Sequence, residues 1–236
     1  MNKRNNILAF QTGIKEGLAM PFWMVLASMI GFGSMAQDVG LSMKIAVGSS
    51  LGIWGLPGQV AMVELMAIGL PTLSIVIASS LANMRFMPMI IVAMPLFKGS
   101  RSALKYRYFL AQMLSINIWS VFMRHGPKLA VEDRLPFYFG VSLICLIGGC
   151  IGTIIGFTAA EFLPLYLTVS LIFLNPVYFV FVFSSAQNSN CLIAAGLGAA
   201  LGPLLYQVAP EWTVPLTGIL AGSIAFYFSK WLGRRT

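Results

Sequence analysis

Apolar runs of about 20 residues, joined by short polar connections, make up almost the whole of this chain. An α-helix of that length crosses the hydrocarbon core of a bilayer and satisfies its own backbone polar groups within the lipid. Only 9% of the 236 residues are charged, against roughly 25% in soluble domains. The sequence therefore predicts an all-α polytopic membrane protein with about seven to eight hydrophobic segments, folded as a single transmembrane domain over residues 1–236.

Polar and turn-forming residues separate the apolar segments and place their approximate ends. Residues 1–16 are polar enough to lie on the surface, and the first span is expected over residues 17–36. The segment 106–123 fits either a span or an interfacial amphipathic helix, and the sequence does not decide between them. The remaining segments are expected at 42–70, 71–97, 137–157, 165–184, 191–207 and 212–232.

Glycine and proline interrupt two of these segments. Because proline cannot donate a helical hydrogen bond, Gly55 and Pro57 are expected to end one half-helix and open another, and Pro88 is expected to break the next segment. The first amides of the new helix lack intrahelical acceptors and lie at the positive end of its dipole. Gly58 and Gln59 are therefore candidates to bind an anionic group such as a carboxylate.

Polar side chains accompany these breaks. Glu64 and Arg85 are ionisable, and Gln59 and Asn83 are amides. An ionised side chain near the centre of a membrane helix costs about 2.5–3.5 kcal/mol on insertion scales, so such groups need partners, a cavity or a function. One interpretation is a substrate site. The alternative is a pair of packing kinks, with Arg85 reaching the interface or pairing structurally with Glu64.

Basic residues gather at the two ends of the chain and in one connection, where they favour a cytoplasmic location. An even number of crossings must then precede the connection, whereas three full spans would place it outside. We therefore expect residues 42–70 to enter the membrane, turn at Gly55 to Gly58, and leave on the same side. The basic residues are Lys3, Arg4 and Lys15, then Lys98, Arg101, Lys105 and Arg107, and finally Lys230, Arg234 and Arg235.

Two further prolines lie inside apolar segments of the second half. Pro176 follows Asn175, Pro203 follows Gly202, and both are expected to break their helices. Each half of the chain would then hold a broken segment, as inverted repeats do, although the identity between the halves is weak. An inverted repeat is accordingly one possible organisation of the fold.

Several short motifs occur in an order and spacing that resemble the AzlC-like (azaleucine resistance) branched-chain amino-acid permeases. The motifs are Phe10-x-x-Gly13 with Pro21, Gly31-Phe32-Gly33-x-x-Ala36-x-x-x-Gly40-Leu41-Ser42, Gly58-Gln59, and Asn83-x-Arg85. The resemblance covers the first half of the chain by motif and the second half mainly by hydropathy. It implies a large transporter subunit that exports branched-chain amino acids and works with a small AzlD-like membrane subunit.

The chain departs from that family pattern at two places. Phe86 stands where the family usually has a histidine after Asn-x-Arg, and Ile116-Asn117 stands in place of an acidic pair usual in a later helix. Asn117 therefore joins the candidate substrate site. The departures imply that coupling or substrate range differs in this chain.

Enzyme functions find little support in the sequence. His125 is the single histidine, which argues against a histidine-based metal site or catalytic triad. No Gly-x-x-x-x-Gly-Lys motif is present, so the chain itself is not expected to hydrolyse ATP. The net charge of +8 is better explained by topology signals and lipid contact than by nucleic acid. We expect no metal and no cofactor.

The resulting hypothesis is a multi-pass inner-membrane exporter of branched-chain or similar aliphatic amino acids. The substrate carboxylate would meet Arg85 or the amides of Gly58 and Gln59, Gln59 and Asn83 would bond polar atoms, and Glu64 would receive the ammonium or a coupled proton. Two rivals remain. One is a channel or a transporter for another small solute, and the other is a non-transporting membrane scaffold.

Overall fold

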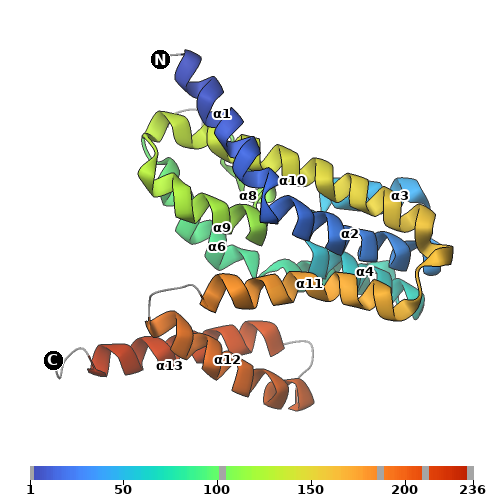
Figure 1. The fold of residues 1–236 in the computed structure, drawn as a ribbon. Coiled ribbons are helices and arrows are strands. Elements are labelled where there is room, and N and C mark those ends of the chain that lie inside the picture. The colour runs from blue at the N-terminus through green and yellow to red at the C-terminus, as the bar shows by residue number, and fades with distance from the viewer. Residues whose placement is uncertain (1–2, 101–104, 185–188, 209–212, 233–236) are drawn as a thin grey trace. The chain divides into compact units, whose positions relative to one another are not determined.

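The computed structural model describes residues 3–100, 105–184, 189–208 and 213–232, and the secondary structure of these residues is entirely helical (Figure 1). Three basic residues used in the topology argument, Arg101, Arg234 and Arg235, lie outside the described residues. The chain divides into two compact units, Met1–Asn175 and Pro176–Thr236, and each is described by itself. That both belong to one transmembrane domain stays a prediction.

Helices follow one another with short connections through the first unit. They are α1 (Lys3–Leu18), α2 (Met20–Asp38), α3 (Met43–Gly52), α4 (Leu56–Ala67), α5 (Thr72–Asn83), α6 (Phe86–Ala93), η1 (Met94–Phe97), α8 (Arg107–Gln112), α9 (Ile116–His125), η2 (Gly126–Lys128), α10 (Val131–Ala159) and η3 (Ala160–Phe162). The helix α11 (Leu165–Ser184) crosses from the first unit into the second, which continues with α12 (Ser189–Val208) and α13 (Thr213–Leu232).

One helix in the described part of the chain, α10 continued by η3, is long and apolar enough to cross a membrane by itself. The count rises to three if two bent pairs each form one span: α1 with α2, bent by 53°, and α5 with α6 and η1, bent by 47°. Shorter apolar helices include α4 and parts of α11, α12 and α13. These helices confirm an all-α membrane protein, while the seven to eight segments stay a prediction as membrane crossings.

The first two helices pack along α10 in the same direction, as Figure 1 shows. A Cβ atom on Gly13 would collide with the backbone of Phe137, one on Gly152 with the carbonyl of Leu26, and one on Gly156 with the carbonyl of Ile30. These glycines let the helix backbones touch. Small residues on one face of α1 thus allow it to dock on α10 while most of its other side chains stay exposed or half-buried, and a location of residues 1–16 on the membrane surface stays a prediction.

This close packing gives a prediction for Gly156. Replacing it with alanine places a Cβ against the carbonyl of Ile30, which cannot move aside as a flexible side chain would. We expect Gly156→Ala to lower the free energy of unfolding by about 1–3 kcal/mol. Gly48 in α3 has open space around its Cβ position and is the matched control, with no loss expected. Equal unfolding temperatures of the two variants in detergent would contradict the packing.

The predicted break within residues 42–70 is present, two residues earlier than expected. Helix α3 ends at Gly52, residues Ile53 to Gly55 are irregular, and Pro57 lies in the first turn of α4. The hydroxyl of Ser50 meets that of Thr153 at 2.9 Å, so α3 runs beside the C-terminal half of α10. Gln59 reaches back to Ser50, which shows that α4 turns back after the break. We call this pair the α3–α4 hairpin.

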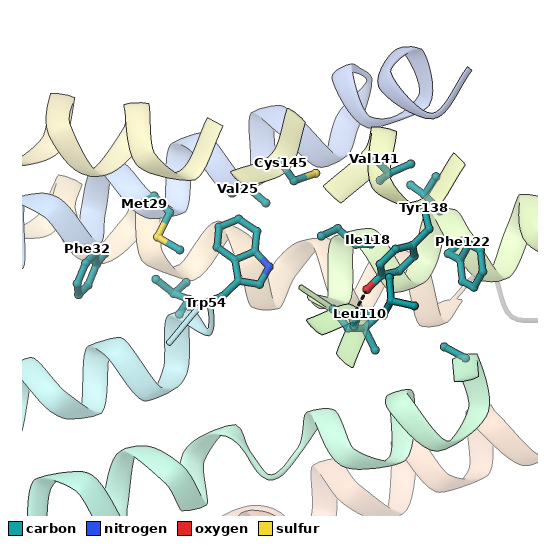
Figure 2. Close-up of a cluster of buried hydrophobic side chains, with 14 of the residues drawn as sticks. Val25, Met29, Phe32, Trp54, Leu110, Ile118, Phe122, Tyr138, Val141 and Cys145 are labelled. Atoms are coloured by element: carbon teal, nitrogen blue, oxygen red, sulfur yellow. Dashed lines mark hydrogen bonds between the residues drawn. The ribbon is translucent and has the colours of Figure 1, made fainter. Parts of the chain in front are cut away.

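A second helical hairpin, formed by α8 and α9, lies beside the N-terminal half of α10. The hydroxyl of Tyr138 donates to the carbonyl of Leu110 in α8 at 2.6 Å, and the ring of Phe122 in α9 packs on Tyr138 (Figure 2). Residues 106–123 therefore form neither a straight span nor a single interfacial helix. The two hairpins begin at opposite ends of α10, and their tips meet beside its middle.

The segment from α5 to η1 contacts the tip of the α3–α4 hairpin and, farther along, the start of α10. Ser79 and Asn83 bond Gly58 at the tip of the α3–α4 hairpin, and Phe97 stacks on Phe122 near the start of α10. The helix is interrupted at Met84 and Arg85, which confirms the break expected near Pro88. The charge-parity argument is satisfied if α5 to η1 crosses the membrane once and neither hairpin crosses it, and this topology stays a prediction.

Cysteine labelling tests this topology. With the native cysteines replaced, Asp38→Cys and Leu70→Cys should react from one side of the membrane and Lys98→Cys from the other. The reason is that the α3–α4 hairpin returns to the side from which it enters, whereas α5 to η1 crosses. Labelling of positions 38 and 70 from opposite sides would contradict the hairpin.

The breaks expected at Pro176 and Pro203 are not helix ends. Pro176 lies inside α11 and Pro203 lies inside α12, and both helices continue through them. A proline removes one backbone hydrogen bond, and a helix can absorb that loss without ending when no glycine or turn follows. In the second unit, α12 and α13 pack against each other, and the buried Ala221 and Ala225 lie on α13. The inverted repeat stays a prediction.

Candidate functional site

Three interruptions of the helices meet at one small cavity beside the middle of α10. They lie between α3 and α4, between α5 and α6, and between α8 and α9, and α2 contributes further lining residues. The lining residues are Val25, Ser28, Met29, Trp54, Gly55, Leu56, Pro57, Arg85, Phe86, Ser115, Ile116 and Asn117. Segments that are far apart in the sequence thus place their irregular backbone at one point, which is where discontinuous helices of transporters bind substrate.

The tips of the two hairpins are joined by side-chain hydrogen bonds to backbone. The indole Nε1 of Trp54 donates to the carbonyl of Met113 at 3.0 Å, and the amide of Gln112 donates to the carbonyl of Gly52. Carbonyls freed at the ends of α3 and α8 therefore find donors on the opposite hairpin. Figure 2 shows Trp54 in the same buried cluster as Val25 and Met29.

The backbone of Trp54 is itself unusual. Its φ of 45° lies in the left-handed region, where bulky residues rarely occur. Its side chain is 4% exposed, so the contacts of the ring hold this conformation in place.

Asn83 stabilises the start of α4 from a neighbouring helix. Its Oδ1 accepts from the backbone N–H of Gly58 at 3.2 Å, and Ser79 donates to the carbonyl of Gly58 at 2.8 Å. The backbone N–H of Gln59 donates to Gly55 within the helix. The expectation of free amides at Gly58 and Gln59 was therefore wrong, because the Asn83 side chain already occupies the position predicted for an anion.

Gln59 is fully buried and lies away from the cavity. Its Nε2 donates to the hydroxyls of Ser49 and Ser50, both at 3.1 Å, and Ser50 bonds Thr153 in α10. Gln59 therefore fastens α4 to α3 and, through Ser50, to α10. A direct contact with a substrate in the cavity is not supported by this position.

Arg85 lines the cavity and has no ion-pair partner among the described residues. Its Nε is buried without a hydrogen-bond partner, and its guanidinium lies 5.6 Å from the centroid of the Phe86 ring. Glu64 is exposed on α4 and does not line the cavity. Pairing of Arg85 with Glu64 was therefore wrong, and so was the placement of Glu64 in the site, because Glu64 lies on another face of α4.

The cavity is electrostatically positive. The N-termini of α4 and α9 both end at it, with Leu56 and Ile116 in the lining, and each contributes the positive end of a helix dipole. Arg85 adds a full charge. Such an arrangement favours a carboxylate over a cation.

The volume of the cavity is about 30 Å³, far below the roughly 300–1,000 Å³ of typical small-molecule sites. A space of this volume is large enough for a water molecule and too small for an amino acid. Binding of a larger molecule therefore requires the hairpin tips, α2 and the α5–α6 break to move apart.

The pattern of the AzlC protein family matches residues 21–163, which is more than half of the chain. The chain belongs to the AzlC family. The match includes every residue that lines the cavity. No curated protein and no solved structure matches the chain. AzlC proteins are transporters associated with branched-chain amino acids, and they are not an enzyme family.

Both departures from the AzlC pattern border the cavity. Phe86, Ile116 and Asn117, at which the resemblance implied departures, all belong to the lining. Asn117 was predicted as a site residue, and the structure brings it beside Arg85 in the same cavity. The two positions at which the resemblance implied a difference thus lie in one cavity.

The sequence reasoning on this AzlC protein missed Ser28, Trp54 and Ser115. A signal for Ser115 was available, since its hydroxyl accepts from the backbone N–H of Ile118 at 3.4 Å, and serine before an apolar run is a common N-cap. Ser28 gave no signal, because a lone serine in an apolar helix usually bonds its own helix, as Ser28 does to Met24.

Proposed function

We propose that this AzlC protein exports branched-chain or similar aliphatic amino acids across the inner membrane of the cell, as a multi-pass secondary transporter coupled to protons. The observation that carries the proposal is Arg85 at the junction of three broken helices, with no ion-pair partner among the residues that the structure describes. The Nε of Arg85 is buried without a hydrogen-bond partner, and a carboxylate satisfies a guanidinium with two parallel hydrogen bonds.

The lining suits the remaining parts of an aliphatic amino acid. Val25, Met29 and Leu56 present apolar surface to a branched side chain. Asn117 and Ser28 offer oxygen atoms to the ammonium group. The start of α4 is fixed by the hydrogen bonds of Gly58, Gln59 and Asn83, and these residues therefore support the site without touching the substrate.

The cavity could open to either side of the membrane by separation of the two hairpin tips, which are joined by hydrogen bonds. The bonds from Trp54 and Gln112 join the α3–α4 hairpin to the α8–α9 hairpin, and the hairpins extend toward opposite ends of α10. Movement of one hairpin opens the cavity toward one side while the other hairpin keeps it closed. Alternating access of this kind is general among transporters with discontinuous helices.

The scaffold alternative is less well supported by the position of these residues. A scaffold would present its polar side chains to a partner, but Arg85 lines the cavity and Gln59 is fully buried. The efflux experiment below distinguishes an amino-acid exporter from a channel and from a carrier of another small solute.

That experiment is efflux of labelled leucine, isoleucine, valine and methionine from loaded vesicles, with and without a proton gradient. We expect efflux of the branched-chain substrates to exceed that from vesicles lacking the protein and to depend on the gradient. Flux of unrelated solutes at equal rates would indicate a channel. Absence of efflux for all four amino acids, with the partner subunit present, would contradict the proposed function.

A small AzlD-like membrane subunit is the proposed partner. The outward faces of α5 and α6 are strongly apolar, with Leu73 and Ile91 among the exposed side chains, and they lie against lipid or against such a subunit. We expect the purified chain alone to transport at a small fraction of the rate of the co-expressed pair. Full activity of the single chain in reconstituted vesicles would contradict this partnership.

A further inference from the structure

The charges around the cavity bear on which part of a substrate it recognises. Arg85 is the single ionisable side chain in the lining. The acidic residues of the described ranges all lie elsewhere: Glu16 pairs with Arg124 and His125, and Asp38, Glu64, Glu132, Asp133 and Glu161 do not line the cavity. The cavity therefore supplies a strong partner for a carboxylate and no ionised partner for an ammonium group.

An ammonium group entering this cavity would lose hydration without gaining a counter-ion. It would also face the guanidinium of Arg85 and the positive ends of α4 and α9, which disfavour a second cation. The neutral oxygens of Asn117 and Ser28 compensate only part of this cost. Removing the amino group from the substrate removes the cost and keeps the carboxylate and the apolar side chain.

We propose that the cavity recognises branched aliphatic monocarboxylates through the carboxylate alone, and that it binds those without an amino group at least as well as the amino acids. The class includes the 2-oxo acids with the carbon skeletons of leucine, isoleucine and valine. This inference rests on the proposed function, because it assigns a substrate class to the same site.

Three compounds that share the isobutyl side chain separate the two charged groups. Leucine carries both, 4-methylpentanoate carries the carboxylate alone, and 3-methylbutylamine carries the ammonium alone. Each is added to co-reconstituted vesicles during efflux of labelled leucine. We expect 4-methylpentanoate to half-inhibit within about threefold of the concentration of unlabelled leucine, and 3-methylbutylamine to need at least about 30-fold more. Inhibition is measured because 4-methylpentanoic acid crosses bilayers unaided.

A variant with an added negative charge tests whether the preference for the carboxylate over the ammonium group comes from the charges of the lining. Asn117→Asp adds a carboxylate to the lining, and we expect it to weaken inhibition by 4-methylpentanoate about tenfold relative to leucine. Gln37→Glu adds the same charge near the end of α2, outside the lining, and should leave the ratio unchanged. If the Asn117 variant does not fold, inhibition of the wild-type protein by the three compounds still tests the proposal.

Thermal unfolding of the purified complex with each compound separates this inference from the proposed function. Efflux of leucine with protection by 3-methylbutylamine, and none by 4-methylpentanoate, overturns the inference and leaves the proposed function intact. Protection by 4-methylpentanoate without any leucine efflux supports the inference and contradicts amino-acid export. No protection by any of the three, and no efflux, overturns both.

Discussion

Replacing Arg85 with glutamine is expected to abolish transport while leaving a folded protein in the membrane. Loss of the charged partner of a buried carboxylate costs about 2–5 kcal/mol, which corresponds to a loss of about 30-fold or more in substrate binding. Stability should not fall, because Arg85 has no ion-pair partner among the described residues that its removal would strand. Efflux from vesicles, with the unfolding temperature measured beside it, checks both parts.

Two further variants show whether Arg85 acts on a substrate carboxylate. Arg85→Lys should also transport poorly, since a point charge does not reproduce the two-pronged geometry of a guanidinium. Glu64→Gln should transport normally, and the double variant Arg85→Gln with Glu64→Gln should be as inactive as Arg85→Gln alone. Efflux near the wild-type rate in the double variant would show that Arg85 does not bind the substrate carboxylate.

Replacing Trp54 with alanine is expected to cause the largest loss of stability. The ring is buried against Gly149 and Val25, and its Nε1 donates to the carbonyl of Met113. Deleting a buried tryptophan side chain costs about 3–5 kcal/mol, and here the Met113 carbonyl also loses its donor. Chemical unfolding in detergent measures this loss.

Trp54→Phe is the matched control for that measurement. It keeps an aromatic ring in the cluster but removes the hydrogen bond between the hairpin tips, so we expect a loss of about 1–3 kcal/mol. Faster opening of the cavity should accompany it, because one of the bonds that join the tips is gone. Equal stability of Trp54→Ala and wild type would show that the tips are not joined as described.

Local sequence signals were enough to place most helices and two of the three interruptions. Gly55 and Pro57 mark the first break, and the ends of α11 and α13 agree with apolar runs bounded by polar residues. The break between α8 and α9 was missed because Met113 and Leu114 are apolar and no glycine or proline marks it. The tertiary hydrogen bond that Met113 accepts from Trp54 stabilises this break.

Only part of the candidate site could be predicted, because some of its contacts form between helices that are distant in the sequence. Arg85 and Asn117 could be identified because charged or polar residues are rare in membrane segments. The partners of Gly58 and Gln59 could not, since they come from Asn83 and Ser49 through contacts between helices. The direction of Glu64 on α4 was equally hidden, because apolar residues surround the whole of that helix and give it no preferred face.

If substrate binds in the cavity where the three breaks meet, it should protect a cysteine at position 28 from chemical labelling. Ser28 lines the cavity on α2, and its hydroxyl bonds only its own helix in the described structure, so Ser28→Cys should fold normally. In a background without native cysteines, leucine should slow the labelling of Cys at position 28 by a small thiol reagent. The protection should disappear when Arg85→Gln is added. Unchanged labelling in the presence of leucine, in a protein that still transports leucine, would contradict the site.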